Sequence, residues 1–191
     1  GILATGGGKS IITTDIILDG HRDGLTEVVM AHRNELVGQM SLHVARRGIP
    51  HRIIGSSKTV SGIIQEHRAE FGRSFVNPDA KCSVGSVQTI VSRLDQLKQW
   101  GAQVDRFTGD EGHHFLRENM WGKAARLFTN ARGLLVTACP LRADGAGLGS
   151  HADGIVDAMV VGPPMRELID IGALSDYEII IPSTDFAIGD D

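Results

Sequence analysis

The sequence predicts one α/β domain, with a mostly parallel sheet that helices cover on both faces. Its apolar runs are continuous rather than alternating, which is typical of strands that are buried on both faces. Strand-like runs also alternate with helix-like stretches, as in parallel sheets whose strands are joined by helices. The chain has 191 residues, which is enough for one domain with a full hydrophobic core.

The first half of the chain alternates helix and strand. Residues 11–18 have helical apolar spacing, and Asp19-Gly20 supplies a glycine that is expected to end this helix. The β-branched run 26–31 predicts a buried strand. A helix with one apolar face follows, and Gly48-Ile49-Pro50 ends it before a strand at 51–55. The apolar residues of that face are Leu36, Val37, Met40 and Val44.

The second half continues this alternation after an ambiguous region at 56–80. In that region Ile63-Ile64 could begin a helix, whereas 72–78 has the composition of a loop. The predicted strands are 82–87, a weaker one at 103–108, 133–138, 157–161 and 178–181. The predicted helices are one through Ile90, Leu94 and Leu97, one at 118–130 and one at 164–171.

Charge is distributed unevenly along the chain. The net charge of −4 argues against a protein that is basic all over, as a nucleic-acid coat would be. Residues 31–73 nevertheless carry seven Arg or Lys against three Glu, whereas from 151 onward nine Asp or Glu face Arg166 alone. Solvated surface charge is the default interpretation of either run. A polyanionic partner is expected toward the first half.

Cysteine content and hydropathy bound the compartment. Cys82 and Cys139 are too few for a disulfide framework, and both lie in apolar runs, so they predict core residues of a cytoplasmic protein. No apolar run approaches the length of a membrane span, so no membrane partner is expected. The chain opens directly into an apolar run without a basic leader, and that run is short, so we expect a truncated N-terminus.

The stretch Ala4-Thr5-Gly6-Gly7-Gly8-Lys9-Ser10 predicts a loop that wraps a phosphate group. Glycines let main-chain N–H groups approach an anion, and the following helix adds its positive N-terminal end. Lys9 can reach the β- and γ-phosphates of ATP, and the Ser10 hydroxyl can hold Mg²⁺. The strict pattern has glycine where this chain has Leu3. A glycine-rich turn without function is the alternative, but the apolar lead-in, the glycines, the lysine and the helix all agree.

A second polar stretch, Asp110-Glu111-Gly112-His113-His114, follows the weaker strand. Asp110 is suited to hold Mg²⁺, and Glu111 to orient or deprotonate an attacking water. The alternative is a polar turn with two solvated acids. A metal site built from His113 and His114 is disfavoured, because adjacent side chains diverge on a helix or strand.

Five stretches, in order, resemble motifs I, Ia, Ib/Ic, II and III of superfamily 2 helicases. They are LATGGGKS, AHRNELVGQ, VGSVQTI, DEGHH and TACPLRADGAGLG. Within this DEAD/DEAH-box-like superfamily the sequence most resembles the bacterial and phage DNA helicases of the XPB type. The resemblance covers almost the whole chain. It implies that residues 1–191 form a RecA-like P-loop NTPase domain, the first of the family's two, with the second absent.

The resemblance also implies a role for each matching position. The positions implied to bind ATP and Mg²⁺ are Thr5, Gly6, Gly7, Gly8, Lys9, Ser10 and Asp110. The positions implied to contact the backbone of a DNA strand are Arg33, Ser86, Gln88 and Thr89. Glu111 would serve the hydrolytic water, and His113 would couple the nucleotide site to motif III at Thr137 and Cys139. Binding to nucleic acid is then expected to be largely sequence-independent and strongly salt-dependent.

Three positions depart from the family pattern. Gly112 stands where alanine is usual, Cys139 stands where threonine is usual, and Gly109 is a poor ending for a buried strand. These departures predict weaker coupling rather than weaker nucleotide binding. The second domain would supply an arginine finger, so the isolated chain is expected to hydrolyse ATP poorly.

The function that the resemblance implies is the ATP-binding lobe of a DNA helicase or translocase. Three alternatives remain open: the duplex-translocating motor of a restriction or remodelling complex, an RNA helicase, and a non-catalytic module that senses nucleotides. Motors of the first kind share these motifs but do not separate strands. The likeness to phage proteins places the expected compartment in a bacterial or phage-infected cell.

Overall fold

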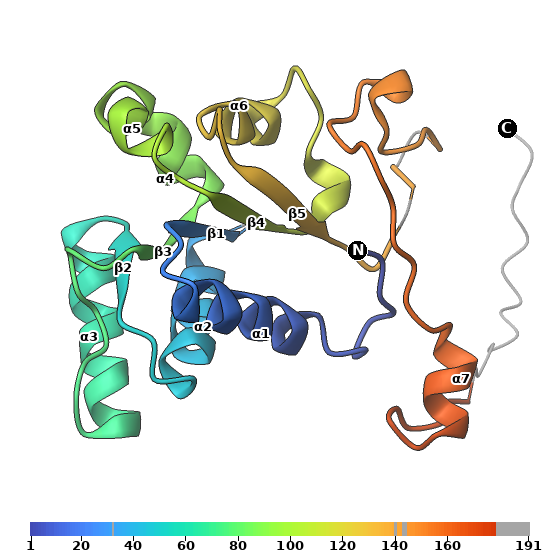
Figure 1. Ribbon diagram of the computed structural model, residues 1–191. Coiled ribbons are helices and arrows are strands. Elements are labelled where there is room, and N and C mark those ends of the chain that lie inside the picture. Colours follow the sequence, from blue (N-terminus) through green and yellow to red (C-terminus); the bar gives the residue numbers. More distant parts are fainter. Residues whose placement is uncertain (32, 140, 143–144, 179–191) are drawn as a thin grey trace, which may run out of the picture.

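The computed structural model describes residues 1–31, 33–139, 141–142 and 145–178. Its core is a five-stranded sheet in the order β2-β3-β1-β4-β5, and every neighbouring pair of strands is parallel (Figure 1). The strands are β1 (Glu27–Ala31), β2 (His51–Ile54), β3 (Cys82–Ser86), β4 (Arg106–Asp110) and β5 (Arg132–Val136). The predicted α/β class with a parallel sheet is confirmed.

Helices cover both faces of this sheet. Figure 1 shows α1 and α2 below the strands and α4, α5 and α6 above them. Val28 and Val29 are neighbours in β1 but belong to different core clusters, one on each face, which explains the continuous apolar runs. The helices are α1 (Lys9–Arg22), α2 (Asn34–Arg46), α3 (Ser57–Phe71), α4 (Val87–Ser92), α5 (Leu94–Gly101), α6 (Met120–Arg126) and α7 (Met165–Asp170). None of the described helices is long and apolar enough to cross a membrane.

The apolar lead-in extends the sheet beyond β5. Ile2 forms parallel bridges with Thr137 on one side and Val161 on the other. The Leu3 N–H donates to the Thr137 carbonyl over 3.0 Å, and the Gly162 N–H donates to the Ile2 carbonyl over 2.8 Å. Residues 1–4 therefore make strand-like contacts through Ile2 and form no strand of the described sheet.

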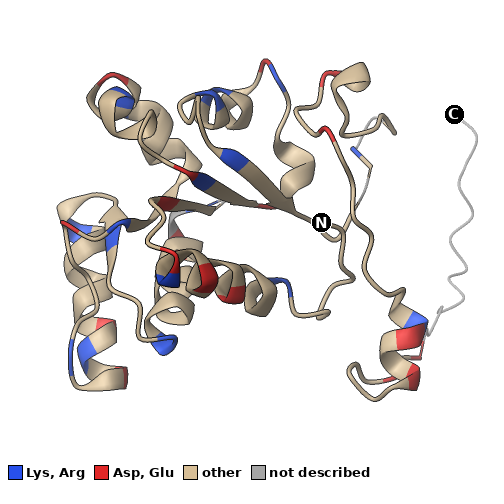
Figure 2. Ribbon diagram, viewed as in Figure 1, with Lys and Arg blue, Asp and Glu red and all other residues tan. Residues whose placement is uncertain are grey.

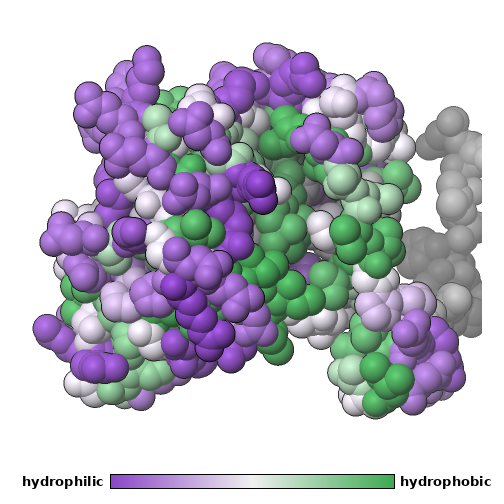
Figure 3. Space-filling view, viewed as in Figure 1, coloured by the Kyte–Doolittle hydropathy of each residue, from purple (hydrophilic) through white to green (hydrophobic). Residues whose placement is uncertain are grey.

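The predicted strand at 157–161 is wrong, because only a single bridge at Val161 forms there. Apolar surface gathers near the middle and right of the face in Figure 3, and the exposed side chains of this segment include Met159, Val160 and Val161. Of the predicted strand at 178–181, residues 179–181 lie outside the described part of the chain.

Two helix boundaries differ from the prediction. α1 does not stop at Asp19-Gly20 but continues to Arg22. Gly20 is buried, and a Cβ placed there would lie 2.2 Å from Arg106 Nη2 and 2.3 Å from Glu27 Oε2. Gly20 therefore makes room for the partly buried ion pair of Arg106 and Glu27 rather than ending the helix.

The helix predicted through 90–97 is broken at Arg93 into α4 and α5, and the ambiguous region 56–80 contains α3. Cys82 lies in the core as predicted, and burial raises the pKa of its thiol to about 12. Cys139 is exposed, contrary to the prediction, because β5 ends at Val136 and the chain leaves the core there.

Two fully buried histidines join α2, β2 and α3 through one serine. His51 and His67 are inaccessible to solvent, and their Nε2 atoms lie 2.6 and 3.0 Å from Ser41 Oγ. The Phe75 N–H donates to His67 Nδ1, and His51 Nδ1 lies 2.9 Å from the Ile49 carbonyl, which can only accept. Donors and acceptors balance only if both rings are neutral, with His67 donating to Ser41 and Ser41 donating to His51.

This network predicts loss of stability in mild acid. Burial lowers the pKa of His51 to about 4 and also lowers the pKa of His67. The unfolded chain takes up protons below about pH 6.5 and the folded chain does not, so folding weakens as pH falls from there toward 4. The loss is roughly 1.4 kcal/mol per pH unit for each histidine that stays neutral.

Urea unfolding between about pH 6.5 and 5, above the range in which most carboxylates titrate, measures this loss. The pH slope is expected to be shallower in His51→Gln and unchanged in His21→Gln, which alters an exposed histidine of α1. An unfolding free energy that stays constant over this range would contradict the prediction.

Candidate functional site

Each predicted motif follows the carboxyl end of a parallel strand. The glycine loop follows Ile2, Arg33 follows β1, and Ser86 ends β3. Asp110 ends β4, and Thr137 follows β5. The carboxyl ends of parallel strands meet at one edge of a sheet, which is where open α/β sheets bind their ligands. The fold therefore brings together residues as far apart in the sequence as Ile2 and Thr137.

The glycine loop presents an uncapped helix end. Gly6 and Gly8 have φ angles of +78° and +84°, which side chains rarely adopt. Gly8 is the N-cap of α1, no side chain caps this helix, and its first turn carries no acidic residue. The Gly7 N–H closes a turn by donating to the Ala4 carbonyl over 2.9 Å. The free N–H groups and the helix dipole of α1 favour an anion at this position.

The residues around this loop fit a nucleotide with Mg²⁺. Among the residues that the structure describes, none beyond the chain neighbours of Gly8 comes within 4 Å of a Cβ built there, so a phosphate group has room to approach the main chain. Lys9 is half-buried as the first residue of α1, and Thr5 and Ser10 are exposed beside it. The hydroxyl of Ser10 and the carboxylate of Asp110 are oxygen ligands of the kind that Mg²⁺ prefers.

The acidic pair has an unusual backbone. Glu111 has φ +53° and ψ +53°, in the left-handed region, and its N–H donates to Asp110 Oδ1 over 2.9 Å. Such a conformation costs a non-glycine residue about 1–3 kcal/mol and is concentrated at functional sites. The short 3₁₀ turn Gly112–His114 follows immediately. The backbone therefore leaves the extended conformation of β4 at Glu111, directly after Asp110.

His113 joins the acidic pair to the segment after β5. Its Nδ1 lies 2.9 Å from Thr137 Oγ1 and 3.4 Å from Glu111 Oε2. The Thr137 hydroxyl donates to the Cys139 carbonyl and accepts from the Cys139 N–H. His113 Nδ1 must therefore carry the ring proton that is donated to Thr137. Thr137 makes this contact alone, and the Cys139 thiol donates instead to the Leu141 carbonyl.

The two histidines of this turn do not diverge as expected. The centroids of the His113 and His114 rings are 4.1 Å apart, and the His114 ring lies 5.2 Å from the Trp121 ring. The 3₁₀ turn, which is neither an α-helix nor a strand, brings the two adjacent rings together. Within the described ranges, no three His, Cys, Asp or Glu side chains gather as metal ligands.

An open pocket lies between Glu111 and Arg33. Its volume is about 520 Å³, and the side chains from α2 and from the 3₁₀ turn face each other across it. The lining residues are Arg33, Glu35, Leu36, Glu111, His113 and His114. Arg33 is exposed, so its guanidinium is available to a ligand at this edge.

The predicted contact stretch Ser86–Thr89 forms the start of α4. Ser86 Oγ accepts from the Thr89 N–H over 3.2 Å and donates to Thr89 Oγ1 over 2.9 Å. Ser56 and Thr59 form the same pair of contacts, at 3.1 and 2.9 Å, at the start of α3. Both sites carry the pattern Gly-Ser-x-x-Thr, a repeat in the sequence that could have identified the second one. Gln88 lies within the first turn of α4.

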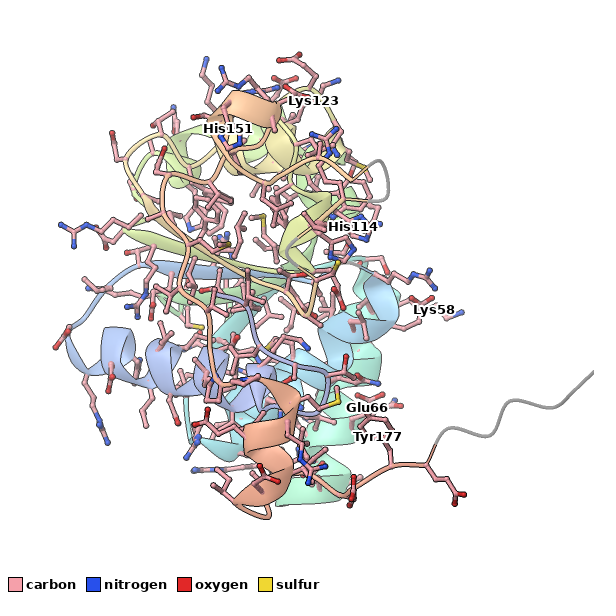
Figure 4. All side chains as sticks on the ribbon, turned by 90° about the vertical axis from the view of Figure 1, so that its right-hand side faces the viewer. Lys58, Glu66, His114, Lys123, His151 and Tyr177 are labelled. Carbon is pink, nitrogen blue, oxygen red and sulfur yellow. The ribbon has the colours of Figure 1, made fainter. Side chains whose placement is uncertain are left out.

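Basic side chains are spread over the molecule rather than confined to one face. Figure 2 shows Lys and Arg on helices of both layers and on the strands β4 and β5. Figure 4 shows Lys58 projecting outward at the start of α3. Within residues 31–73, where an excess of positive charge was predicted, Arg33 follows the carboxyl end of β1 and Lys58 follows that of β2.

A family model described as "Type III restriction enzyme, res subunit" matches residues 2–142. No curated protein matches the chain. The UvsW helicase from bacteriophage T4 is 19% identical with a TM-score of 0.55, over 73% of this chain and 46% of the UvsW chain. A nuclease-deletion mutant of the Type ISP restriction-modification enzyme LlaGI, in complex with a DNA substrate mimic, is 14% identical with a TM-score of 0.57, over 90% of this chain and 18% of that chain. This chain therefore spans less than half of either solved chain.

Proposed function

This chain belongs to the family of the type III restriction enzyme res subunit, and we propose that it is the ATP-binding first lobe of a DNA helicase or translocase. The observation that carries the proposal is the meeting of three parts at one sheet edge. They are the glycine loop on α1, the acidic pair Asp110-Glu111 and the His113–Thr137 contact. A phosphate loop opposite two carboxylates is the arrangement that nucleoside triphosphate hydrolysis requires.

In this lobe the loop residues and Lys9 hold the phosphates of ATP. Ser10 and Asp110 hold Mg²⁺, which neutralises charge on the phosphates when it is bound. Glu111 accepts a proton from the attacking water, because its carboxylate lies in the cluster that His113 joins to Thr137. His113 and Thr137 connect the site to the segment after β5.

Magnesium-dependent ATP binding, measured by calorimetry on this chain, tests the proposal directly. Inorganic tripolyphosphate serves as a ligand without a base or sugar and reports the phosphate loop alone. Saturable binding of both ligands by the folded chain is expected. A folded chain that binds neither would refute the assignment.

A nucleic-acid strand is proposed to run along the same edge, over Arg33, Ser86, Gln88 and Thr89. Replacing Arg33 by alanine is expected to weaken binding equally for oligonucleotides of unrelated sequence. Its loss also makes the slope of log affinity against log salt shallower by about one unit, as for one phosphate contact. Fluorescence anisotropy at several salt concentrations measures both quantities.

Arg22→Ala is the matched control, because Arg22 ends α1 and pairs with Asp19 on the surface. Its salt slope should equal that of the original chain. A loss in Arg33→Ala that depends on the base sequence would exclude a backbone contact at this residue.

Translocation on duplex DNA without strand separation is the second candidate function. It is favoured by the family description, which names a restriction enzyme subunit, whereas strand separation is favoured by the likeness to a helicase. A protein that joins this lobe to a second RecA-like lobe can be tested for both activities. Displacement of a third strand from duplex DNA without unwinding would identify a translocase. We propose a bacterial or phage-infected cytoplasm as the compartment.

A further inference from the structure

The acidic pair is flanked by two glycines whose φ angles are not positive. Gly109 and Gly112 lie on either side of Asp110-Glu111, and neither adopts the left-handed conformation that favours glycine. Conformational freedom therefore does not explain them. Both are buried, and the atoms packed against them explain them instead.

Phe115 and Leu135 fill the space that side chains at these positions would occupy. A Cβ on Gly109 would lie 2.6 Å from Phe115 Cζ and 2.7 Å from Leu135 Cδ2. A Cβ on Gly112 would lie 2.9 Å from Leu135 Cβ. Carbon atoms do not approach this closely in a packed core, so an alanine at either position would displace its surroundings.

Neither neighbour can move aside easily. Phe115 is completely buried, so its ring has no open space to enter, and its N–H donates to the Gly112 carbonyl over 3.1 Å, which ties its backbone to the acidic turn. Leu135 pairs with Gly109 in the register of β4 and β5, so its Cβ is held by the sheet. The backbone that carries Asp110 and Glu111 is the part that would have to shift.

We infer that Phe115 and Leu135 are positioning residues for Asp110 and Glu111, acting through Gly109 and Gly112. This inference rests on the proposed function of the acidic pair. The packing of these two large side chains against the glycines sets the position of the backbone that carries the two carboxylates. Gly112 stands where alanine is usual in the family that the sequence resembles, and the space of an alanine methyl group there is taken by Leu135.

A size exchange between Gly109 and Phe115 tests the inference. Gly109→Ala adds a methyl group against the ring tip, and Phe115→Leu removes that tip. Calorimetry measures the ATP affinity in excess Mg²⁺ and in excess EDTA. The ratio of the affinity in Mg²⁺ to the affinity in EDTA reports how well Asp110 is placed to hold Mg²⁺. Gly109→Ala is expected to lower this ratio roughly tenfold and to keep the affinity in EDTA within about twofold, since the phosphate loop is untouched. The double variant is expected to recover much of the ratio.

Gly62→Ala is the matched control, because a Cβ at that position in α3 meets no other part of the described chain within 4 Å. It should leave both affinities unchanged. If Gly109→Ala does not fold, Phe115→Leu decides alone, because it adds no atoms. It is expected to lower the ratio with the EDTA affinity retained.

Variants that keep the full ratio would overturn the inference, and so would variants whose affinity falls equally with and without Mg²⁺. In both cases ATP binding by the original chain leaves the proposed function standing. If the original chain binds neither ATP nor tripolyphosphate, the proposed function itself fails.

Discussion

Replacing Lys9 by alanine is expected to lower ATP affinity by roughly 100-fold or more. Lys9 is the first residue of α1, beside the two left-handed glycines, and it forms no salt bridge with any residue that the structure describes. A charge-assisted contact to phosphate contributes about 1.5–3 kcal/mol, and contacts to two phosphates reach the upper end of this range. Calorimetric titration with ATP and Mg²⁺ measures the loss.

Lys123→Ala provides the control for lost positive charge. Lys123 is exposed on α6, and Figure 4 shows it at the end of the molecule opposite α7. Its ATP affinity should match that of the original chain. Unchanged affinity in Lys9→Ala would mean that the glycine loop is only a turn, the alternative that the sequence left open.

In a protein that joins this lobe to a second RecA-like lobe, replacing Glu111 by glutamine is expected to stop hydrolysis while ATP remains bound. The amide keeps the shape of the side chain but cannot accept a proton from water. Loss of a general base lowers the rate by roughly 10²–10⁴-fold. The distance of 3.4 Å from Glu111 Oε2 to His113 Nδ1 shows that the carboxylate lies inside the cluster that His113 joins to Thr137. Single-turnover hydrolysis of ATP, together with calorimetry, separates the chemical step from binding.

Glu66→Gln tests whether any lost negative charge has the same effect. Glu66 is exposed on α3, outside the cluster. Its hydrolysis rate should be unchanged. If Glu111→Gln still turns over ATP at the original rate, the proton is accepted elsewhere, and Glu111 loses the proposed role.

The order of the motifs was readable from the sequence because each one is local. A loop that needs positive φ angles usually has glycine at those positions, and Gly6 and Gly8 have positive φ angles. Strands that are buried on both faces have continuous apolar runs, and β1 and β3 form within such runs. A prediction failed where a glycine has two possible structural roles. Gly20 was expected to end a helix, but it makes room for Arg106 and Glu27.

Sequence by itself determined the α/β class, the glycine loop with Lys9, and the acidic pair. These depend on the conformational preferences and chemistry of neighbouring residues. Only the tertiary structure decided that Ser41 joins two neutral histidines, that His113 contacts Thr137, and that Phe115 fills the space beside Gly109. Each of these contacts joins different elements, and packing in three dimensions selects the partner. A local sequence pattern indicates the conformation and chemistry that a residue can adopt, whereas the fold determines which distant atoms it contacts.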